Sequence, residues 1–249
     1  MKFSFEVPIK YLNEFDNEQD YLFILAHHLS NKKYYDYCKQ SIKMKILDNG
    51  AYELGESISP EILLNYAILL DVDIIVIPDK LFDKRRSLQL ETKFHNLLFE
   101  SSYSFRLMKV VCGKNIKEYL KSLIEVANDD KVDIIGISQS RHMITPNLSY
   151  VMEYLYSFAN DFINGDKPIH LLGLTHPYEL IEAHKYNSIE TIDTGRPINF
   201  AFHNKLFPLV KRFDNYKKER GYDINTKKKL NVELAKKNIR RLKKYYAAY

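Results

Sequence analysis

Residues 46–53, Ile46-Leu47-Asp48-Asn49-Gly50-Ala51-Tyr52-Glu53, join an apolar run to a carboxylate and a glycine turn. This pattern predicts a buried strand that carries Asp48 to the edge of a pocket. Two further segments combine a strand-like run with an aspartate in the same way: Ile74-Ile75-Val76-Ile77-Pro78-Asp79 and Ser188-Ile189-Glu190-Thr191-Ile192-Asp193-Thr194-Gly195. The sequence therefore predicts three strands that each present an aspartate at the carboxyl end.

The chain alternates between strand-like and helical segments over most of its length. Runs of Val, Ile and Leu without strict alternation are typical of parallel strands that helices cover. The sequence predicts one helix start at residue 59, because Ser59 is a good N-cap and Pro60 suits the first helical position. The predicted strands are 2–7, 21–26, 44–48, 73–77, 105–111, 132–137, 168–172 and 188–192, and the predicted helices are 59–70, 84–100, 115–127, 147–164 and 177–186.

Eight strand–helix units favour a (β/α)8 barrel of the α/β class, and 249 residues suit that fold. No glycine-rich nucleotide-binding motif follows any strand, which weighs against an open doubly wound sheet. We expect residues 1–206 to form the barrel and residues 207–249 to form a basic helical extension. In that extension, a helix over 226–245 is expected to dock through Leu230, Leu234, Ile239 and Leu242.

The composition indicates the cellular compartment in which the chain functions. With 45% hydrophobic and 28% charged residues, it has the balance of a globular protein. No window is long and apolar enough to span a membrane, and the first residues lack the apolar region of a signal peptide. We therefore expect a cytoplasmic protein, in the host cytoplasm if it is virus-encoded, with no membrane partner.

Positive charge is concentrated at the carboxyl end. Residues 205–249 contain fifteen Lys or Arg and four Asp or Glu, whereas residues 1–204 contain 22 and 28. Such a basic segment suits contact with a polyanion such as nucleic acid. A solvated lysine-rich helix explains the same composition equally well.

The three strand-end aspartates have several chemical interpretations. Each alone is explained by a turn or a helix cap. Together at a barrel mouth they suit a divalent metal, a general acid and base, or a nucleophile with an acid/base partner. Only two cysteines, Cys38 and Cys112, are present, which excludes a disulfide framework and a cysteine-rich zinc site.

Several segments resemble the tRNA-guanine transglycosylase superfamily. Asp48-Asn49-Gly50-Ala51-Tyr52 resembles the family's Asp-Ser-Gly-Gly-Phe segment, and Leu25-Ala26-His27-His28-Leu29 resembles the strand before it. The similarity spans about residues 21–197 and lies in the order and spacing of the segments. The other segments are Pro78-Asp79, Val111-Cys112-Gly113, Ile135-Gly136-Ile137, His170-Leu171-Leu172-Gly173, and Ile192-Asp193 with Arg196.

The resemblance implies a (β/α)8 barrel that exchanges guanine in a polynucleotide for a 7-deazaguanine base. Asp193 would be the nucleophile that attacks C1′, and Asp48 the general acid/base. Asp79 would bind the Watson–Crick edge of the base. No cofactor and no metal are implied for the reaction. The base-binding residues implied are Asp79, Tyr52, Cys112, Gly113, Gly136, His170 and Gly173.

The sequence departs from the tRNA enzymes of that family. It lacks their cysteine-rich zinc site, and Cys112 and His170 stand where those enzymes have a glutamine and a tyrosine. A zinc-free barrel with a basic tail is most similar to the viral and bacterial branch that acts on DNA. We therefore expect DNA as the partner and a 7-deazaguanine as the small-molecule substrate. The expected nucleic-acid-binding residues are Arg141, His142, Arg196, Lys227, Lys228, Lys229, Arg240 and Arg241.

Three other interpretations stay open. The chain could act on tRNA with the same chemistry, or bind nucleic acid without catalysis. A metal-dependent barrel hydrolase would use the same three carboxylates. Whether the chain forms a homodimer is also open.

Overall fold

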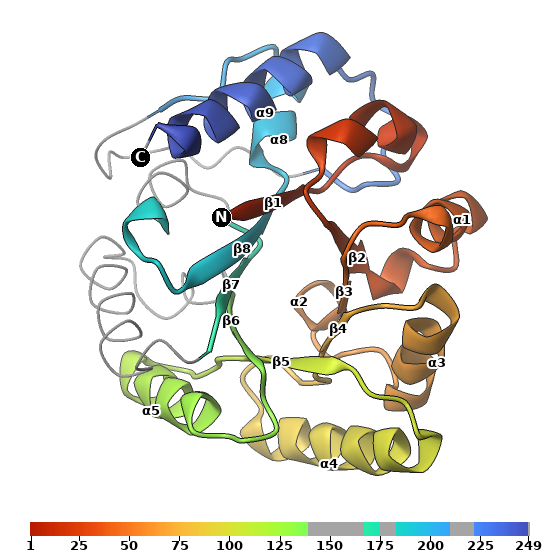
Figure 1. The fold of residues 1–249 in the computed structure, drawn as a ribbon, viewed down its shortest axis with the longest axis vertical. Helices are drawn as coiled ribbons and strands as arrows, with labels where there is room; N and C mark the ends of the chain where they lie inside the picture. Colours follow the sequence, from red (N-terminus) through yellow and green to blue (C-terminus); the bar gives the residue numbers. More distant parts are fainter. Residues whose placement is uncertain (139–166, 175–182, 210–221, 249) are drawn as a thin grey trace.

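The computed structural model describes residues 1–138, 167–174, 183–209 and 222–248 and shows a nearly closed, all-parallel barrel of eight strands. Neighbouring strands follow the order β1-β8-β7-β6-β5-β4-β3-β2. The strands lie at the centre and the helices surround them (Figure 1). The strands are β1 Lys2–Phe5, β2 Leu22–Leu25, β3 Lys45–Asp48, β4 Ile74–Val76, β5 Arg106–Val110, β6 Ile134–Ser138, β7 Ile169–Leu172 and β8 Ile189–Thr194. The predicted (β/α)8 barrel is confirmed.

Each predicted strand overlaps one of these eight strands. The described helices are η1 Ile9–Glu18, η2 Ala26–His28, α1 Lys32–Gln40, α2 Ala51–Leu54, α3 Pro60–Leu70, α4 Lys84–Ser101, α5 Ile116–Ala127, η4 Ala183–Lys185, α8 Arg196–Phe202 and α9 Val232–Ala247. Helix α3 begins as predicted, because the Ser59 side chain accepts from the Ile62 N–H. Neither η1 nor α1 was expected from the sequence. The predicted helix 147–164 lies outside the described residues, as does most of 177–186.

Alternate strand residues fill the inside and the outside of the barrel. Ile46 on β3, Ile74 on β4 and Met108 on β5 belong to a small interior cluster. Their neighbours Leu47, Ile75 and Leu107 pack in the larger cluster with the surrounding helices. Because both faces of each strand are buried, the strands read as continuous apolar runs in the sequence.

Polar side chains connect β1 and β2, which are the two ends of the strand order. The Gln19 side chain lies 6% exposed and makes two hydrogen bonds to Phe5, accepting from its N–H at 2.6 Å and donating to its carbonyl at 2.8 Å. The Ser4 hydroxyl accepts from the Phe23 N–H at 3.0 Å. The Phe3 N–H donates to the Asp20 carboxylate at 2.9 Å. Polar side chains thus satisfy backbone groups where the two strands do not pair directly.

Gln19→Met is expected to lower the free energy of unfolding by about 1–3 kcal/mol, because it leaves two buried backbone groups of Phe5 unsatisfied. Urea unfolding followed by circular dichroism measures this change. Gln40→Met, at an exposed position on α1, is the matched control and should alter stability by less than about 0.5 kcal/mol. Equal stability of the two variants would contradict the assigned role of Gln19.

An ion-pair network connects the outside of β5 to α4 and to the end of α5. Lys109 Nζ lies 2.5 Å from Glu91 Oε1 and 3.1 Å from Asp129 Oδ2. Burial alone would raise the pKa of Glu91, but the neighbouring His95 and Lys109 outweigh it and lower the pKa. Burial would likewise raise the pKa of Asp129, and hydrogen bonds from Lys131 and Lys109 lower it. Both carboxylates are therefore stabilised in their charged form in the folded state.

Lys109→Met is expected to destabilise the fold by about 1–3 kcal/mol near neutral pH, because Glu91 is only 13% exposed and loses its partner. A carboxyl group whose pKa is lower in the folded state stabilises the fold at pH values above its unfolded-state pKa. This stabilisation is lost as the pH falls through the folded-state pKa. The difference from the wild type should therefore shrink below about pH 4. Thermal unfolding across a range of pH measures this difference. Lys93→Met is the control, because Lys93 belongs to an exposed ion pair with Glu61. A pH-independent difference would contradict the ionic explanation.

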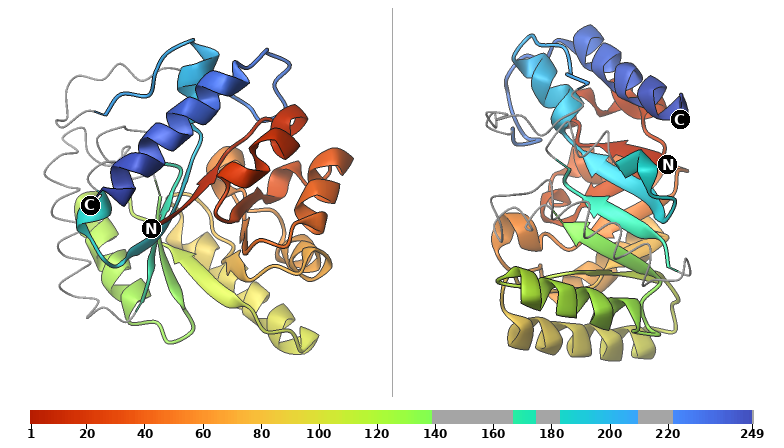
Figure 2. Two further views of the ribbon diagram at one scale, coloured as in Figure 1. Left: turned by 45° about the horizontal axis from the view of Figure 1, so that its top comes forward. Right: turned by 90° about the vertical axis from the view of Figure 1, so that its left-hand side faces the viewer.

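The carboxyl-terminal helix α9 packs along the side of the barrel beside α8 (Figures 1 and 2). Leu230, Ile239 and Leu242 are buried, as predicted, whereas Leu234 is only partly buried. The side-chain amide of Asn238, which is also buried, donates to the Pro197 and Lys205 carbonyls, both at 3.0 Å. Among the described residues, no helix is long and apolar enough to cross a membrane.

Candidate functional site

A cavity of about 60 Å³ opens at the carboxyl ends of the strands, and carboxylates from four strand ends line it. Asp48 ends β3, Asp79 follows β4, and Asp193 lies on β8. Glu6, directly after β1, lines the same cavity. We call this space the acidic cavity. The structure thus brings together the three aspartates that the sequence pattern placed at strand ends.

The Asp193 carboxylate is held by two hydrogen bonds to one oxygen. The Gly173 N–H donates to Oδ1 at 2.9 Å, and His170 Nε2 lies 3.1 Å from the same atom. The other His170 nitrogen lies 2.7 Å from the Thr191 hydroxyl. The His170 ring also stacks on Phe23, with ring centroids 5.2 Å apart. These contacts fix the orientation of the Asp193 side chain, which is 2% exposed.

The turn after β3 orders two of the carboxylates. The Asp48 carboxylate accepts from the Gly50 N–H at 2.9 Å, and Gly50 adopts the left-handed region with φ 78°, which glycine tolerates best. Asn49 donates from its side chain to the Asp79 carboxylate and to the Ile77 carbonyl, both at 2.8 Å. Asn49 therefore connects the ends of β3 and β4 and orients Asp79 toward the cavity.

Negative charge accumulates in the acidic cavity. Burial raises the pKa of Asp48, a hydrogen bond from Gly50 opposes the rise, and the nearby charge of Asp193 adds to it. Burial and Asp193 likewise raise the pKa of Glu6, whereas the charge of Arg196 lowers it. Burial raises the pKa of Asp79 to about 6. Protonated and charged carboxyls can therefore coexist in this cavity near neutral pH.

Two further titratable side chains, His27 and Glu53, lie beside Asp48. Glu53, in the short helix α2, lines the cavity with a side chain that is 41% exposed. His27 in η2 lies against it, with Nδ1 3.9 Å from Glu53 Oε2. Burial, followed by the charge of Asp48, raises the pKa of Glu53.

Three of the predicted base-binding residues line the acidic cavity, namely Asp79, Tyr52 and Gly173. Tyr52 as a whole is 43% exposed. Gly173 has φ 61° and lines the cavity while its N–H holds Asp193.

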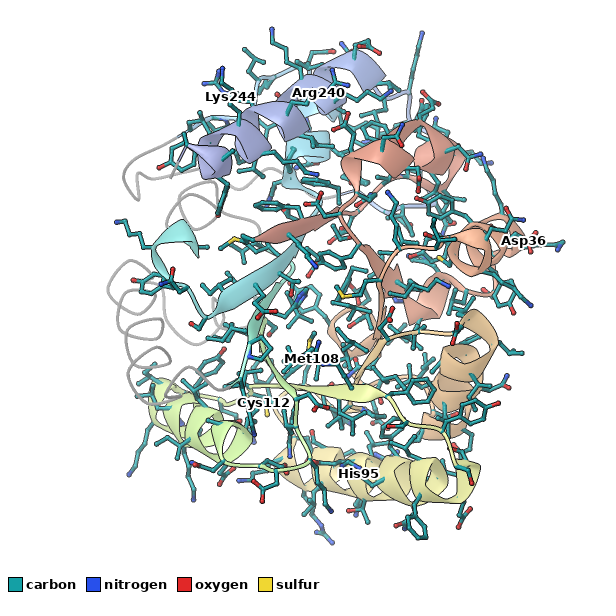
Figure 3. The ribbon with its side chains drawn as sticks, viewed as in Figure 1. Asp36, His95, Met108, Cys112, Arg240 and Lys244 are labelled. Atoms are coloured by element: carbon teal, nitrogen blue, oxygen red, sulfur yellow. The ribbon has the colours of Figure 1, made fainter. Side chains whose placement is uncertain are left out.

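The four other residues that were predicted to bind the base do not line this cavity. His170 is fully buried below it and supports Asp193. A Cβ at Gly136 would lie 3.0 Å from Leu172 Cδ1, so this glycine makes room for a cavity wall. A Cβ at Gly113 would lie 2.4 Å from the Tyr119 nitrogen, so that glycine allows α5 to approach. Cys112 (Figure 3) and Gly113 line a groove between α4 and α5, and this groove shares Asp79 and Val110 with the acidic cavity.

Only some of the residues that were predicted to bind nucleic acid lie near one another. Arg196 is 4% exposed and its charge acts on Glu6, so it does not lie on the surface with the other predicted phosphate ligands. Arg141 and His142 lie outside the described residues. Lys227, Lys228 and Lys229 are exposed just before α9. Lys10 Nζ donates to the Lys227 and Lys228 carbonyls at 3.2 and 2.6 Å.

The predicted basic residues of α9, Arg240 and Arg241, are also exposed. Arg240 pairs with Glu18, with Nη2 and Oε1 3.0 Å apart, and its side chain is 67% exposed. Figure 3 shows Arg240 and Lys244 on the outer side of α9. The helix therefore presents charge to solvent along the side of the barrel.

Sequence reasoning did not assign a role to Glu6, His27 or Glu53. Glu6 lies inside the first predicted strand, 2–7, so the strand-end pattern did not select it, whereas β1 ends at Phe5. Glu53 lies inside the segment quoted first, and His27 ends the second apolar run. Their proximity depends on the positions of η2 and α2, which the sequence pattern does not specify.

No family model matches the chain, and no curated protein is found to be similar to it. The fold and the site define a (β/α)8 barrel with a carboxylate-lined cavity at the carboxyl ends of its strands.

Proposed function

We propose that this chain is a DNA guanine transglycosylase, which exchanges guanine for a 7-deazaguanine base of the preQ0 type through a covalent Asp193–sugar intermediate. The observation that carries the proposal is the convergence of Asp48, Asp79 and the anchored Asp193 on one cavity. The ordered resemblance of segments 21–197 to the transglycosylase superfamily supports the same chemistry.

In the first step, an Asp193 carboxylate oxygen attacks C1′ of the target nucleotide, and the bond from C1′ to N9 of guanine breaks. Asp48 gives a proton to the departing base. In the second step, the incoming 7-deazaguanine gives its N9 proton to Asp48 and attacks C1′, which releases Asp193. The two displacements return both carboxyl groups to their starting states and avoid a free oxocarbenium ion.

The walls of the cavity suit a flat purine-like base. Asp79 can accept hydrogen bonds from the N1–H and the amino group on the Watson–Crick edge, and Asn49 holds it for that contact. Tyr52 offers an exposed ring for stacking. Leu25, Val110 and Leu172 supply apolar surface.

A base that is stacked in a duplex must be flipped out before it can reach such a cavity. The exposed lysines at 227–229, together with Lys10 and Lys33, supply positive charge for phosphates. Lys33 Nζ donates to the Lys10 carbonyl at 3.3 Å, so these side chains lie near one another. A compact barrel without a cysteine-rich zinc site favours DNA over tRNA as the substrate.

Incorporation of labelled guanine into DNA and into tRNA, measured in parallel with the purified chain, tests this function. We expect label to enter DNA at least tenfold faster than tRNA. Faster entry into tRNA would establish the alternative substrate. Tight DNA binding without any incorporation would contradict the proposal and favour a non-catalytic nucleic-acid-binding barrel.

A further inference from the structure

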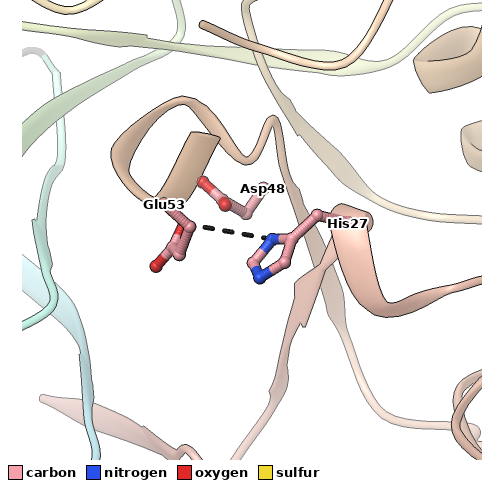
Figure 4. Close-up of side chains that lie close together, drawn as sticks. All are labelled: His27, Asp48 and Glu53. Carbon is pink, nitrogen blue, oxygen red and sulfur yellow. Dashed lines mark ion pairs between the residues drawn. The ribbon is translucent and has the colours of Figure 1, made fainter. Parts of the chain in front are cut away.

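Three potential metal ligands meet at the edge of the acidic cavity. His27, Asp48 and Glu53 each offer one ligand atom, and these atoms lie within 4.8 Å of one another (Figure 4). Among the described residues, this is the one group of three or more His, Cys, Asp or Glu side chains with that geometry. The strand-end aspartates 79 and 193 do not belong to it, so the group differs from the carboxylate set considered from the sequence.

The histidine of this group has an unused ligand atom. His27 Nδ1 is buried and has no hydrogen-bond partner, and the side chain as a whole is 11% exposed. A buried nitrogen without a partner is destabilising, so its presence calls for an explanation. The Glu53 carboxylate, 3.9 Å away, is too distant to accept a hydrogen bond from it. The imidazole nitrogen is therefore available beside Asp48 and Glu53.

The local backbone is shaped to bring His27 against the turn after β3. Strands β2 and β3 pair with Leu25 opposite Asp48, so the segments that follow both strands lie side by side. A Cβ at position 50 would lie 3.4 Å from His27 Nδ1 and 3.5 Å from His27 Cβ. Gly50 thus combines a left-handed turn with space for the imidazole ring. Asp48 and Glu53 flank this glycine on the two sides of the same turn.

Charge at this edge favours a cation. Asp48 and Glu53 bring two carboxylates to the same place, with ligand oxygens within 4.8 Å of each other. A bound divalent ion would compensate the two carboxylates and would give His27 Nδ1 the partner that it lacks.

We propose that His27, Asp48 and Glu53 bind one divalent transition-metal ion, such as Zn²⁺ or Mn²⁺, at the edge of the acidic cavity. One imidazole nitrogen with two carboxylates suits these ions better than Ca²⁺ or Mg²⁺, which favour all-oxygen sites. Metal–ligand bonds of about 2.0–2.2 Å bring ligand atoms to roughly 3–4 Å apart. Small side-chain movements suffice, and exposed Glu53 can make most of them.

Three protein ligands leave coordination positions for water or for a ligand in the cavity. The binding of a cation here does not rest on the proposed base exchange, although both use Asp48. A carboxylate oxygen that binds a cation cannot accept a proton at the same moment. An occupied site is therefore expected to slow an exchange that uses Asp48.

Titration of the metal-free full chain with MnCl2, followed by electron paramagnetic resonance of free Mn²⁺, and with ZnCl2, followed by calorimetry, tests the site. We expect one ion per chain and at least tenfold weaker binding in both His27→Gln and Glu53→Gln. His28→Gln is the matched control, because this neighbouring histidine faces Asn225, with Nδ1 3.0 Å from its side-chain nitrogen. Circular dichroism confirms that each variant is folded.

The second variant keeps the test decisive if His27→Gln fails to fold, because Glu53 is 41% exposed and its substitution leaves the core intact. Absence of saturable binding in the wild type would overturn the proposal. Equal affinity in the wild type and Glu53→Gln would also overturn it. Weakening by His28→Gln as large as that by Glu53→Gln would show that the ion binds elsewhere.

Discussion

Asp193→Asn is expected to lower the rate of base exchange by at least about a thousandfold, because an amide cannot act as the nucleophile at C1′. Asparagine has nearly the same shape, and its side-chain oxygen can still accept from the Gly173 N–H. The variant should therefore fold and bind DNA while losing the chemical step. Release of labelled guanine from DNA, measured under single-turnover conditions, gives the rate.

Asp36→Asn is the matched control for this substitution. Asp36 lies on α1 and pairs with Lys32 at the surface, with 2.9 Å between Nζ and Oδ2. We expect its exchange rate to equal that of the wild type. Full activity in Asp193→Asn would exclude this residue as the nucleophile and leave the chemistry to another carboxylate of the acidic cavity.

Asp48→Asn is expected to reduce the rate constant of exchange by about 10²–10⁴-fold, which is the usual contribution of a positioned acid or base. The amide can still accept from the Gly50 N–H, so the turn should survive. Because the base still enters the cavity, KM should change far less than kcat. Steady-state kinetics with a 7-deazaguanine as the varied substrate separates the two constants.

A kcat within threefold of the wild type would show that the proton moves through another carboxyl group of the cavity, such as Glu6 or Glu53. The same variant should also lose the cation site proposed for His27, Asp48 and Glu53. Glu53→Gln removes a cation ligand and retains Asp48, so the two roles of this carboxylate can be measured separately.

The barrel could be predicted from the sequence because its strands are buried on both faces. Segments such as 44–48 and 73–77 are short and apolar, and helix-forming stretches follow them. The Ser59-Pro60 helix start depends only on local backbone chemistry, and the structure shows it as expected. Helix α1 was not predicted. It consists mostly of tyrosines and lysines, and because only Tyr34 and Cys38 are buried, its buried face is narrow.

The convergence of the aspartates could also be predicted, because parallel strands of a barrel share one mouth. What a strand-end residue contacts depends on side-chain direction, which the pattern does not give. His170 points inward to Asp193, and Gly113 packs against α5. Arg196 begins a helix whose first turn is buried. His170 and Gly113 were expected to contact the base because of the family resemblance, and Arg196 was expected to contact phosphate because it follows a strand end.

The most direct test is mass spectrometry of nucleosides from DNA isolated from cells that express this chain and contain a 7-deazaguanine precursor. The proposal predicts a 7-deazaguanine deoxynucleoside in DNA that is present with the wild type and Asp36→Asn and absent with Asp193→Asn. Unmodified DNA in the wild-type cells, or a modification that persists with Asp193→Asn, would contradict it.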